Sequence, residues 1–415
     1  MLDWAVGVTL VALALRTWVV QGLVFPVTVA GGSMAETLVG PHQQVDCAAC
    51  GQSFAVGLEH LPAGGRATCA HCGYRDNDLR SATPRPGQHL LVDRTALSRG
   101  VPRRWQVVLF RCPARANRLG VKRIVGLPGE SVRIRAGDVY IAGRIARKDL
   151  PQQRSVRQLV HRLPPDRPAT GTPRWQPDTD RSGWQRQEDG FRHRSAKSGS
   201  GPPAAVDWLR YHHPTGTPVR DVVGYDQGQT RRLHGVTDLM LTCRVAATGH
   251  GLLLLAATDG RTRLELHVPN DGGSICLLSG SRPIAWAPIE VGTFSTERFL
   301  EWSLFDAQVL LAIDGTTRLQ HPLDQADLQL RPGPQPLAIG TRQLGVVLKE
   351  LTVWRDVYYT QPRWGRWGLE RAYQLGADEV FVLGDNSPIS DDSRSWPYGG
   401  GLPLRLVVGR PLGVD

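Results

Sequence analysis

Lysine is scarce in this chain of 415 residues: only four of its 49 basic side chains are lysines, and the rest are arginines. Because an arginine keeps its proton in a protein, nearly all of the basic residues are excluded as proton acceptors in a reaction. The net charge of +11 is spread along the chain without a dense basic tract, which disfavours nucleic acid as a partner. At this length we expect two or three folded units, each of about 150 residues.

Long hydrophobic runs are also lacking. The most apolar segment is free of charge only over residues 4–15, about 18 Å of helix against the roughly 30 Å of a bilayer core. If Arg16 extends to the interface and Trp4 and Trp18 lie among the headgroups, residues 1–20 can form a tight single span. A signal segment and a buried helix are the alternatives. We predict a transmembrane anchor, with the rest of the chain outside the cytoplasm because its flank lacks basic residues.

Cysteines are few, but four of them are regularly spaced. Two Cys-x-x-Cys pairs, each followed by glycine, are separated by eighteen residues: Cys47 and Cys50, then Cys69 and Cys72. Four thiolates in this pattern are typical of tetrahedral zinc, so we predict a zinc ribbon inserted at residues 47–83. Two disulfide or redox pairs are the alternative. His71 is expected at the surface. The remaining cysteines are expected to be buried free thiols, with a disulfide between Cys243 and Cys276 as the alternative.

Short runs of β-branched residues follow the cysteine segment. GQHLLVDR, WQVVLFRCP and GVKRIVGLPGESVRIRAGDVYIAGR, within residues 87–144, are punctuated by Gly and Pro and predict paired strands. Residues 379–400 repeat the pattern of an apolar strand, which here ends in a turn rich in hydroxyls and carboxylates. Turns of that kind often carry functional residues. We therefore predict a mainly β fold.

One serine lies in an unusual setting. The sequence VAGGSMAETL, residues 29–38, places Ser33 between a glycine and a methionine with no histidine beside it. Without histidine, a serine nucleophile needs another base, such as a lysine kept neutral by dry surroundings. Only Lys122 lies in an apolar strand context, since Lys148 and Lys349 precede carboxylates and Lys197 lies in a linker-like stretch. A solvated, outward-facing Lys122 is the alternative.

Three segments resemble the serine, lysine and Gly-Asp-Asn boxes of type I signal peptidases, the membrane-anchored Ser/Lys proteases that remove signal peptides. They are GGSMAETL, GVKRIVGLPGE and GDNSPISDDSR, in the family's order. The resemblance covers residues 1–46, 84–148 and 376–413. It implies a single-pass protein of the cytoplasmic membrane, with its catalytic core on the outer face and secretory precursors as substrates. That chemistry needs no cofactor, so the zinc would be structural.

The resemblance also implies roles for individual residues. Ser33 would be the nucleophile, with its backbone N–H in the oxyanion hole, Lys122 the general base, and Ser390 the serine that orients the lysine. Asp392 and Arg394 would form a supporting ion pair. The other supporting residues would be Gly31, Asp385, Asn386 and Ser393.

The sequence departs from the family's pattern at three positions. Glu36 stands where the family usually has proline, Gly31 where many members have a second oxyanion-hole serine, and Gln88 where an aspartate is expected. Loss of one oxyanion donor can slow a reaction by about 100-fold or more. The alternative function is therefore a catalytically impaired, membrane-tethered binding protein that uses the inserted regions. A self-cleaving regulator with a DNA-binding ribbon is a third hypothesis.

A large insertion separates the lysine box from the last box. Residues 149–205 are rich in Pro, Gly, Arg and Ser and are predicted to be irregular, while residues 206–375 contain periodic strands typical of an antiparallel β-sandwich. This part resembles laminin-G and concanavalin-like folds, which implies a carbohydrate or protein ligand, or a purely structural role. The catalytic core would then comprise residues 21–46, 84–148 and 376–415. We expect a core in which a linker replaces residues 152–373 to fold and remain active.

Overall fold

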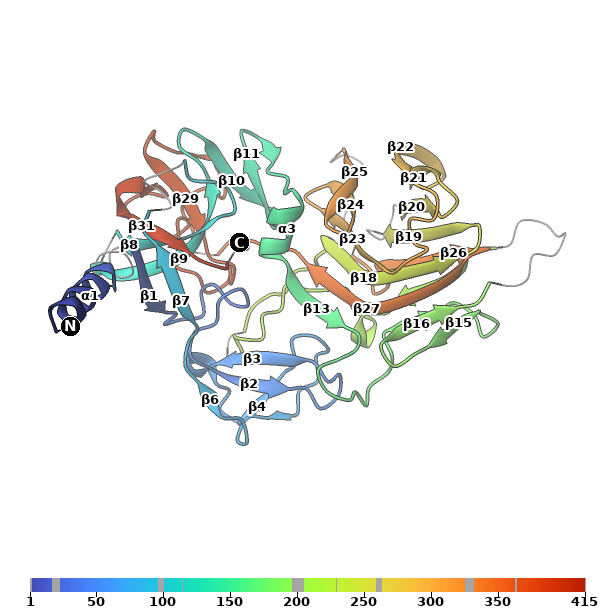
Figure 1. Ribbon diagram of the computed structural model, residues 1–415, viewed down its shortest axis with the longest axis horizontal. Helices are drawn as coiled ribbons and strands as arrows, with labels where there is room; N and C mark the ends of the chain where they lie inside the picture. Colours follow the sequence, from blue (N-terminus) through green and yellow to red (C-terminus); the bar gives the residue numbers. More distant parts are fainter. Residues whose placement is uncertain are drawn as a thin grey trace.

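The computed structural model describes residues 2–16, 23–95, 101–113, 115–195, 205–228, 230–258, 263–324, 332–362 and 364–414. Strands arranged in several antiparallel sheets dominate these residues, which confirms the mainly β prediction. Figure 1 shows three parts: a β core beside the N-terminus, a small lobe below it, and a larger pair of sheets on the other side.

Helix α1 (Leu2–Leu15) precedes the first strand. Among the described residues, no helix combines the length and the apolar character needed to cross a membrane. Residue 1 and residues 17–20 of the predicted anchor lie outside the described part of the chain.

The β core is built on a seven-stranded sheet that brings distant parts of the chain together. In pairing order its strands are β1 (Val24–Thr28), β7 (His89–Asp93), β31 (Val407–Pro411), β8 (Val107–Cys112), β9 (Arg115–Gly126), β29 (Glu379–Leu383) and β30 (Leu402–Pro403). In the interior strand β9, Lys122 lies opposite Val108 of β8, and Arg123 lies opposite Leu383 of β29. Residues before and after the insertion therefore pair directly.

A second, four-stranded sheet completes the core. It comprises β12 (Arg144–Ile145), β11 (Asp138–Ile141), β10 (Ser131–Arg135) and β28 (Tyr373–Gln374). Strand β10 alternates buried and exposed residues, with Val132 and Ile134 fully buried, as expected for a strand with one face toward a core.

The four-cysteine lobe, residues 42–85, lies between β1 and β7 in the sequence. It contains a sheet of β2 (His42–Asp46), β3 (Ser53–Gly57) and β6 (Pro84–Arg85), and a pair formed by β4 (Arg66–Ala67) and β5 (Asn77–Asp78). A short 3-10 helix, η2 (Leu58–His60), follows β3. Its apolar core is small and includes Phe54, Val56 and Leu79 beside two of the cysteines.

The insertion forms the two-sheet region, residues 158–355. One sheet contains β15 (Trp184–Arg186), β16 (Gly190–His193), β27 (Gly345–Arg355), β18 (Leu239–Thr248), β23 (Arg298–Phe305), β24 (Gln308–Ile313) and β25 (Thr316–Pro322), with β13 (Gln158–Arg162) also paired to β27. The other contains β14 (Trp175–Pro177), β17 (Asp207–Tyr211), β26 (Leu337–Arg342), β19 (Leu252–Thr258), β20 (Arg263–Pro269), β21 (Gly273–Ser279) and β22 (Arg282–Ile289). Buried residues of both sheets, such as Leu241 and Ile339, belong to one apolar cluster.

The prediction that residues 149–205 are irregular is wrong. They include helix α3 (Leu150–Val156), begun by a capping box between Asp149 and Gln152, and strands β13 to β16. These strands are short, but Trp175, Trp184 and Phe191 lie almost fully buried in the core of the two-sheet region. Burial of single large aromatic side chains stabilises strands too short to show a periodic sequence pattern.

The isolated cysteines of the two-sheet region are free thiols. Cys243 is fully buried on β18, whereas Cys276 on β21 is only partly buried. The structure therefore contradicts the alternative of a disulfide between them.

A buried ion cluster joins the core to the two-sheet region. The ammonium nitrogen of Lys148, just before α3, lies 2.8 Å from an Asp306 oxygen and 2.7 Å from an Asp356 oxygen, with all three side chains almost fully buried. Burial by itself would lower the pKa of Lys148, but the two carboxylates outweigh it and raise that pKa. Burial also raises the pKa of Asp306, to about 6, because Lys148 offsets its cost only in part.

We expect Lys148→Met to lower the free energy of unfolding at pH 7 by about 3 kcal/mol or more, because two buried carboxylates lose their cation. Lys349→Met is the matched control: Lys349 is exposed and lies 3.4 Å from Glu297, so its loss should cost less than about 1 kcal/mol. Toward pH 5 the cost of Lys148→Met should shrink, because protons then neutralise the carboxylates. Urea unfolding at both pH values measures this, and equal costs for the two variants would contradict it.

Candidate functional site

The structure brings Ser33 and Lys122 together. Ser33 lies in the turn that follows β1, and Lys122 lies on the interior strand β9. The Lys122 Nζ is 2.5 Å from the Ser33 Oγ and 3.2 Å from the carbonyl oxygen of Val121. Lys122 is 5% exposed, so the alternative of a solvated, outward-facing lysine is wrong. A hydroxyl and an amine at this distance can exchange a proton directly.

Burial lowers the affinity of Lys122 for its proton. It lowers the pKa of Lys122 because the charged amine loses its water, and the nearby carboxylates of Asp392 and Asp391 only partly oppose this effect. The neutral amine, which can accept a proton, therefore forms at a lower pH than in a solvated lysine.

The turn after β29 contains the predicted ion pair between Asp392 and Arg394. Their charged groups are 2.7 Å apart and fully buried, and the Arg394 guanidinium also donates to the carbonyl oxygens of Thr360 and Ser387. Burial by itself would raise the pKa of Asp392, but Arg394 and a contact with Ser390 outweigh it and lower that pKa. This pair fixes the turn beneath the lysine.

Ser390 lies close to Ser33 across Gly384. A Cβ added to Gly384 would lie 2.3 Å from both the Ser33 carbonyl oxygen and the Ser390 Oγ, so only glycine fits there. The buried Ser390 Oγ makes no well-aligned hydrogen bond with another described residue, and none is seen to Lys122.

Sequence reasoning missed a second buried ion pair. Arg123, next to Lys122 but on the opposite face of β9, binds Asp385 in a two-pronged arrangement with N–O distances of 2.9 and 2.6 Å. Thr37 also donates to Asp385, over 2.6 Å, and the Arg123 guanidinium reaches Ser155 on α3. The alternation of side chains along a strand was the available signal that Arg123 faces away from Lys122.

The other predicted supporting residues also lie at the turn. The backbone N–H of Asn386 donates to the Ser33 carbonyl over 3.1 Å, and its side-chain amide donates to the Gly32 carbonyl over 2.9 Å. The Ser393 hydroxyl oxygen accepts the backbone N–H of Val382, which fastens the turn to β29. Gly31 is partly buried near the nucleophile turn.

Two of the three departures from the family's pattern, Glu36 and Gln88, make hydrogen bonds in the structure. Glu36 accepts a hydrogen bond from the backbone N–H of Gly224 in the insertion, and it lines a cavity of about 610 Å³ together with Arg154 and Arg157. The side chain of Gln88 accepts the backbone N–H of Val39. The Glu36 carboxylate is therefore held by the insertion.

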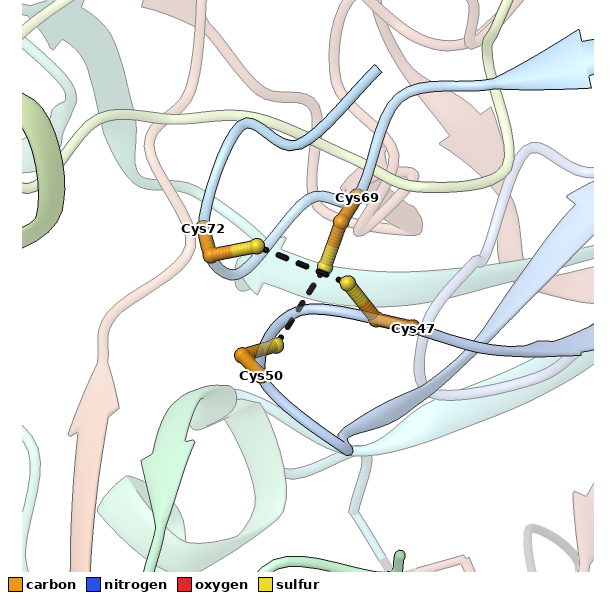
Figure 2. Close-up of side chains that lie close together, drawn as sticks. All are labelled: Cys47, Cys50, Cys69 and Cys72. Atoms are coloured by element: carbon orange, nitrogen blue, oxygen red, sulfur yellow. Dashed lines mark hydrogen bonds between the residues drawn. The ribbon is translucent and has the colours of Figure 1, made fainter. Parts of the chain in front are cut away.

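The four cysteines of the lobe converge on one point, as Figure 2 shows. The sulfurs of Cys47 and Cys72 are 3.5 Å apart, those of Cys50 and Cys69 are 3.7 Å apart, and all four lie within 4.8 Å of one another. Ligands about 2.3 Å from a tetrahedral metal ion would have this spacing. Because the structure records all four as free thiols, the alternative of two disulfides is contradicted. The four thiols can hold a metal ion.

Three aspartates form a second group of possible metal ligands, and a nearby lysine offsets part of their negative charge. Carboxylate oxygens of Asp138, Asp238 and Asp306 lie within 4.8 Å of one another. The ammonium group of Lys148 binds Asp306, and burial raises the pKa of Asp238 to about 7. A lysine and bound protons can thus neutralise this cluster.

A cavity of about 780 Å³ lies between the four-cysteine lobe and the two-sheet region. Its lining includes Cys50, Tyr74, His161, Trp175 and His213. His71, expected at the surface, is 4% exposed, and Arg174 binds its carbonyl oxygen, because the insertion packs against the lobe.

Comparisons with known proteins bear on this site. Residues 70–187 match the family model described as signal peptidase, peptidase S26. This match supports the signal peptidase family. The matched range contains Lys122 but neither Ser33 nor Ser390. No curated protein matches the chain.

Solved structures resemble only part of the chain. The carbohydrate-binding module CBM66 from Bacillus subtilis is 12% identical, with a match over 43% of this chain and 94% of that one and a TM-score of 0.28. A Bacillus subtilis protein of unknown function with a galectin-like fold is 13% identical over 48% of this chain and 99% of that one, with a TM-score of 0.30. Similarity at this level carries no functional argument.

We expect the purified protein to contain one metal ion per chain at the four cysteines, and Cys69→Ser to reduce this content and loosen the lobe. Elemental analysis with limited proteolysis measures both effects. Cys243→Ser, at a buried cysteine remote from the lobe, is the control and should keep the metal. Metal-free native protein with four reactive thiols would contradict the expectation.

Proposed function

We propose that this chain is a serine endopeptidase of the signal peptidase type, with Ser33 as nucleophile and Lys122 as general base. The observation that carries the proposal is the 2.5 Å contact between the Ser33 hydroxyl and a buried lysine whose pKa is lowered. The match of residues 70–187 to the signal peptidase family model supports the same conclusion.

In the proposed reaction, neutral Lys122 takes the hydroxyl proton as the Ser33 Oγ attacks the scissile carbonyl carbon. The carbon–nitrogen bond breaks, the leaving amine takes the proton from Lys122, and an ester to Ser33 remains. Lys122 then takes a proton from water, whose oxygen attacks the ester carbon. The bond from that carbon to the Ser33 Oγ breaks, the Oγ takes the proton back from Lys122, and the new carboxyl terminus is released. The ion pair of Asp392 and Arg394 holds the turn that contains Ser390 in place beside the lysine.

The negative oxygen formed during each attack needs hydrogen-bond donors. We assign one of them to the backbone N–H of Ser33, which makes no hydrogen bond with another described residue. Gly31 has no side chain to supply a second donor, so we expect slower turnover than a site with two donors would reach.

The substrates we propose are secretory precursors with small residues before the scissile bond. We also propose that the protein is held at the cytoplasmic membrane by its N-terminal segment, with the core on the outer face. The metal at the four cysteines would be structural zinc, because thiolates alone leave no open position for chemistry. In this proposal, the core of residues 21–46, 84–148 and 376–415 carries the ribbon and the sandwich as insertions.

We expect Ser33→Ala and Lys122→Ala each to abolish cleavage of a purified precursor. Lys122→Arg should not restore it, because arginine stays charged. Cleavage by the unchanged protein should rise with pH through the pKa of Lys122, which burial places below that of a free lysine. Gel analysis of timed digests measures these rates, with Lys349→Ala, at an exposed site, as the active control.

Two results would decide against this mechanism. An active Lys122→Arg variant would rule out lysine as the base. A folded, unchanged protein that cuts no precursor at any pH would favour the alternative, an impaired binding protein that uses its inserted regions.

We also propose that the cavity beside the four-cysteine lobe binds a carbohydrate. Its lining includes His161 and Trp175, and the buried Nδ1 of His161 and Nε1 of Trp175 have no partner among the described residues. Burial lowers the pKa of His161 and lowers that of His213 to about 3, so both rings are neutral near pH 7. Neutral rings beside unpaired donors and acceptors suit sugar hydroxyls.

Saturation-transfer NMR with hexose and N-acetylhexosamine oligosaccharides tests the carbohydrate ligand. We expect Trp175→Phe, which keeps a ring but loses the N–H, to weaken binding by about fivefold, the value of one neutral hydrogen bond. Trp286→Phe is the control, because Trp286 is 63% exposed on β22 and does not line the cavity. Binding of peptides and not of sugars would point to a protein ligand, and equal effects of both variants would contradict the cavity as the site.

A further inference from the structure

One segment of the insertion reaches into the candidate active site. Residues 222–227, here the contact segment, lie in a loop closed by a bridge between Arg220 and Gly235. Asp221 holds the two sides of this loop together, since its carboxylate binds Arg231 and the backbone N–H of His234. The contact segment is therefore presented on a closed loop.

Tyr225 packs directly against the nucleophile turn. A Cβ added to Gly32 would lie 2.1 Å from the Tyr225 ring, and one added to Gly57 of the four-cysteine lobe would lie 2.2 Å from it. The ring is fully buried, and its hydroxyl donates to the carbonyl oxygen of Pro41 over 3.0 Å. The peptide before Ser33 thus lies against a rigid aromatic surface supplied by the insertion.

Asp226 joins this contact through Asn386. The Asn386 side-chain amide donates to the Asp226 carboxylate and to the Gly32 carbonyl oxygen, both over 2.9 Å. The residue after Gly32 is Ser33, so the bridged carbonyl belongs to the peptide unit that carries the Ser33 N–H. Because a peptide unit is planar, holding its C=O in one direction also fixes the direction of its N–H.

We propose that Asp226 is a positioning residue that, through Asn386, aims the backbone N–H of Ser33 at the oxygen of the tetrahedral intermediate. This inference rests on the proposed function and adds to it an element that comes from the insertion. A fixed donor stabilises the developing charge without having to reorganise, so its orientation affects the rate of the chemical step more than substrate binding.

The surroundings of Asp226 support this role. Its second oxygen and the side-chain oxygen of Asn386 are buried and have no partner among the described residues. Burial raises the pKa of Asp226 to about 6, although the hydrogen bond from Asn386 favours the charged form. The protein thus keeps a poorly solvated carboxylate beside the nucleophile turn. Residues 152–373 therefore include groups that contact the nucleophile turn and its support, Asn386.

The test compares two substitutions of Asp226 in the full-length protein with a precursor peptide as substrate. Asp226→Leu keeps the size but loses the acceptor, and we expect kcat to fall by about tenfold while KM changes by less than about twofold. Asp226→Asn keeps an acceptor for Asn386 and should retain kcat within about twofold. Asp324→Ala removes an exposed carboxylate of the two-sheet region and is the matched control.

The possible results distinguish a failure of this inference from a failure of the proposed function. If the unchanged protein cuts no precursor, the proposed function fails. If it cuts, and Asp226→Leu is as fast as the control, the positioning role is overturned. Equal losses in Asp226→Asn and Asp226→Leu overturn it too, because an acceptor alone should suffice. Circular dichroism checks folding, and Asp226→Ala replaces the leucine variant if that variant does not fold.

Discussion

The antiparallel pairing of β9 with β29 is the constraint on which the candidate site depends. It joins Arg123 to Leu383 across more than two hundred residues and places the turn of residues 384–394 beside Lys122. The insertion must therefore return the chain to the core, where β29 pairs with β9. Two fully buried ion pairs then fix the result, one on each side of the strand: Asp392 with Arg394, and Asp385 with Arg123.

The pKa values of the two buried lysines of the core shift in opposite directions, although burial by itself lowers both. Lys148 lies between two carboxylates, which keep it charged and make it a structural cation. No carboxylate of the described residues is in direct contact with Lys122, so the loss of water dominates and lowers its pKa. Distance to the nearest carboxylate thus separates a structural lysine from a candidate base, although both are almost fully buried.

Local sequence patterns predicted the features that depend on short-range spacing. The convergence of the two cysteine pairs could be inferred from their spacing. The contact of Ser33 with Lys122 and the pair of Asp392 with Arg394 were implied by the resemblance of three segments to the boxes of type I signal peptidases. The strands within residues 149–205 could not, since one buried aromatic residue in a three-residue strand leaves no periodic signal. The contact of Asp226 with Asn386 was also missed, because it joins residues 160 positions apart in different units of the chain.

The residues that contact the nucleophile turn determine how early in synthesis the site can assemble. Ser33 is made early, but its supports lie far along the chain, at Tyr225 and at Asn386. During synthesis from the N-terminus, the site geometry is therefore incomplete until residues 384–394 have left the ribosome. A nascent chain that already carries its serine and its lysine lacks the partners that hold them in place. The order of residues along the chain thus delays the assembly of the site long after the serine has been made.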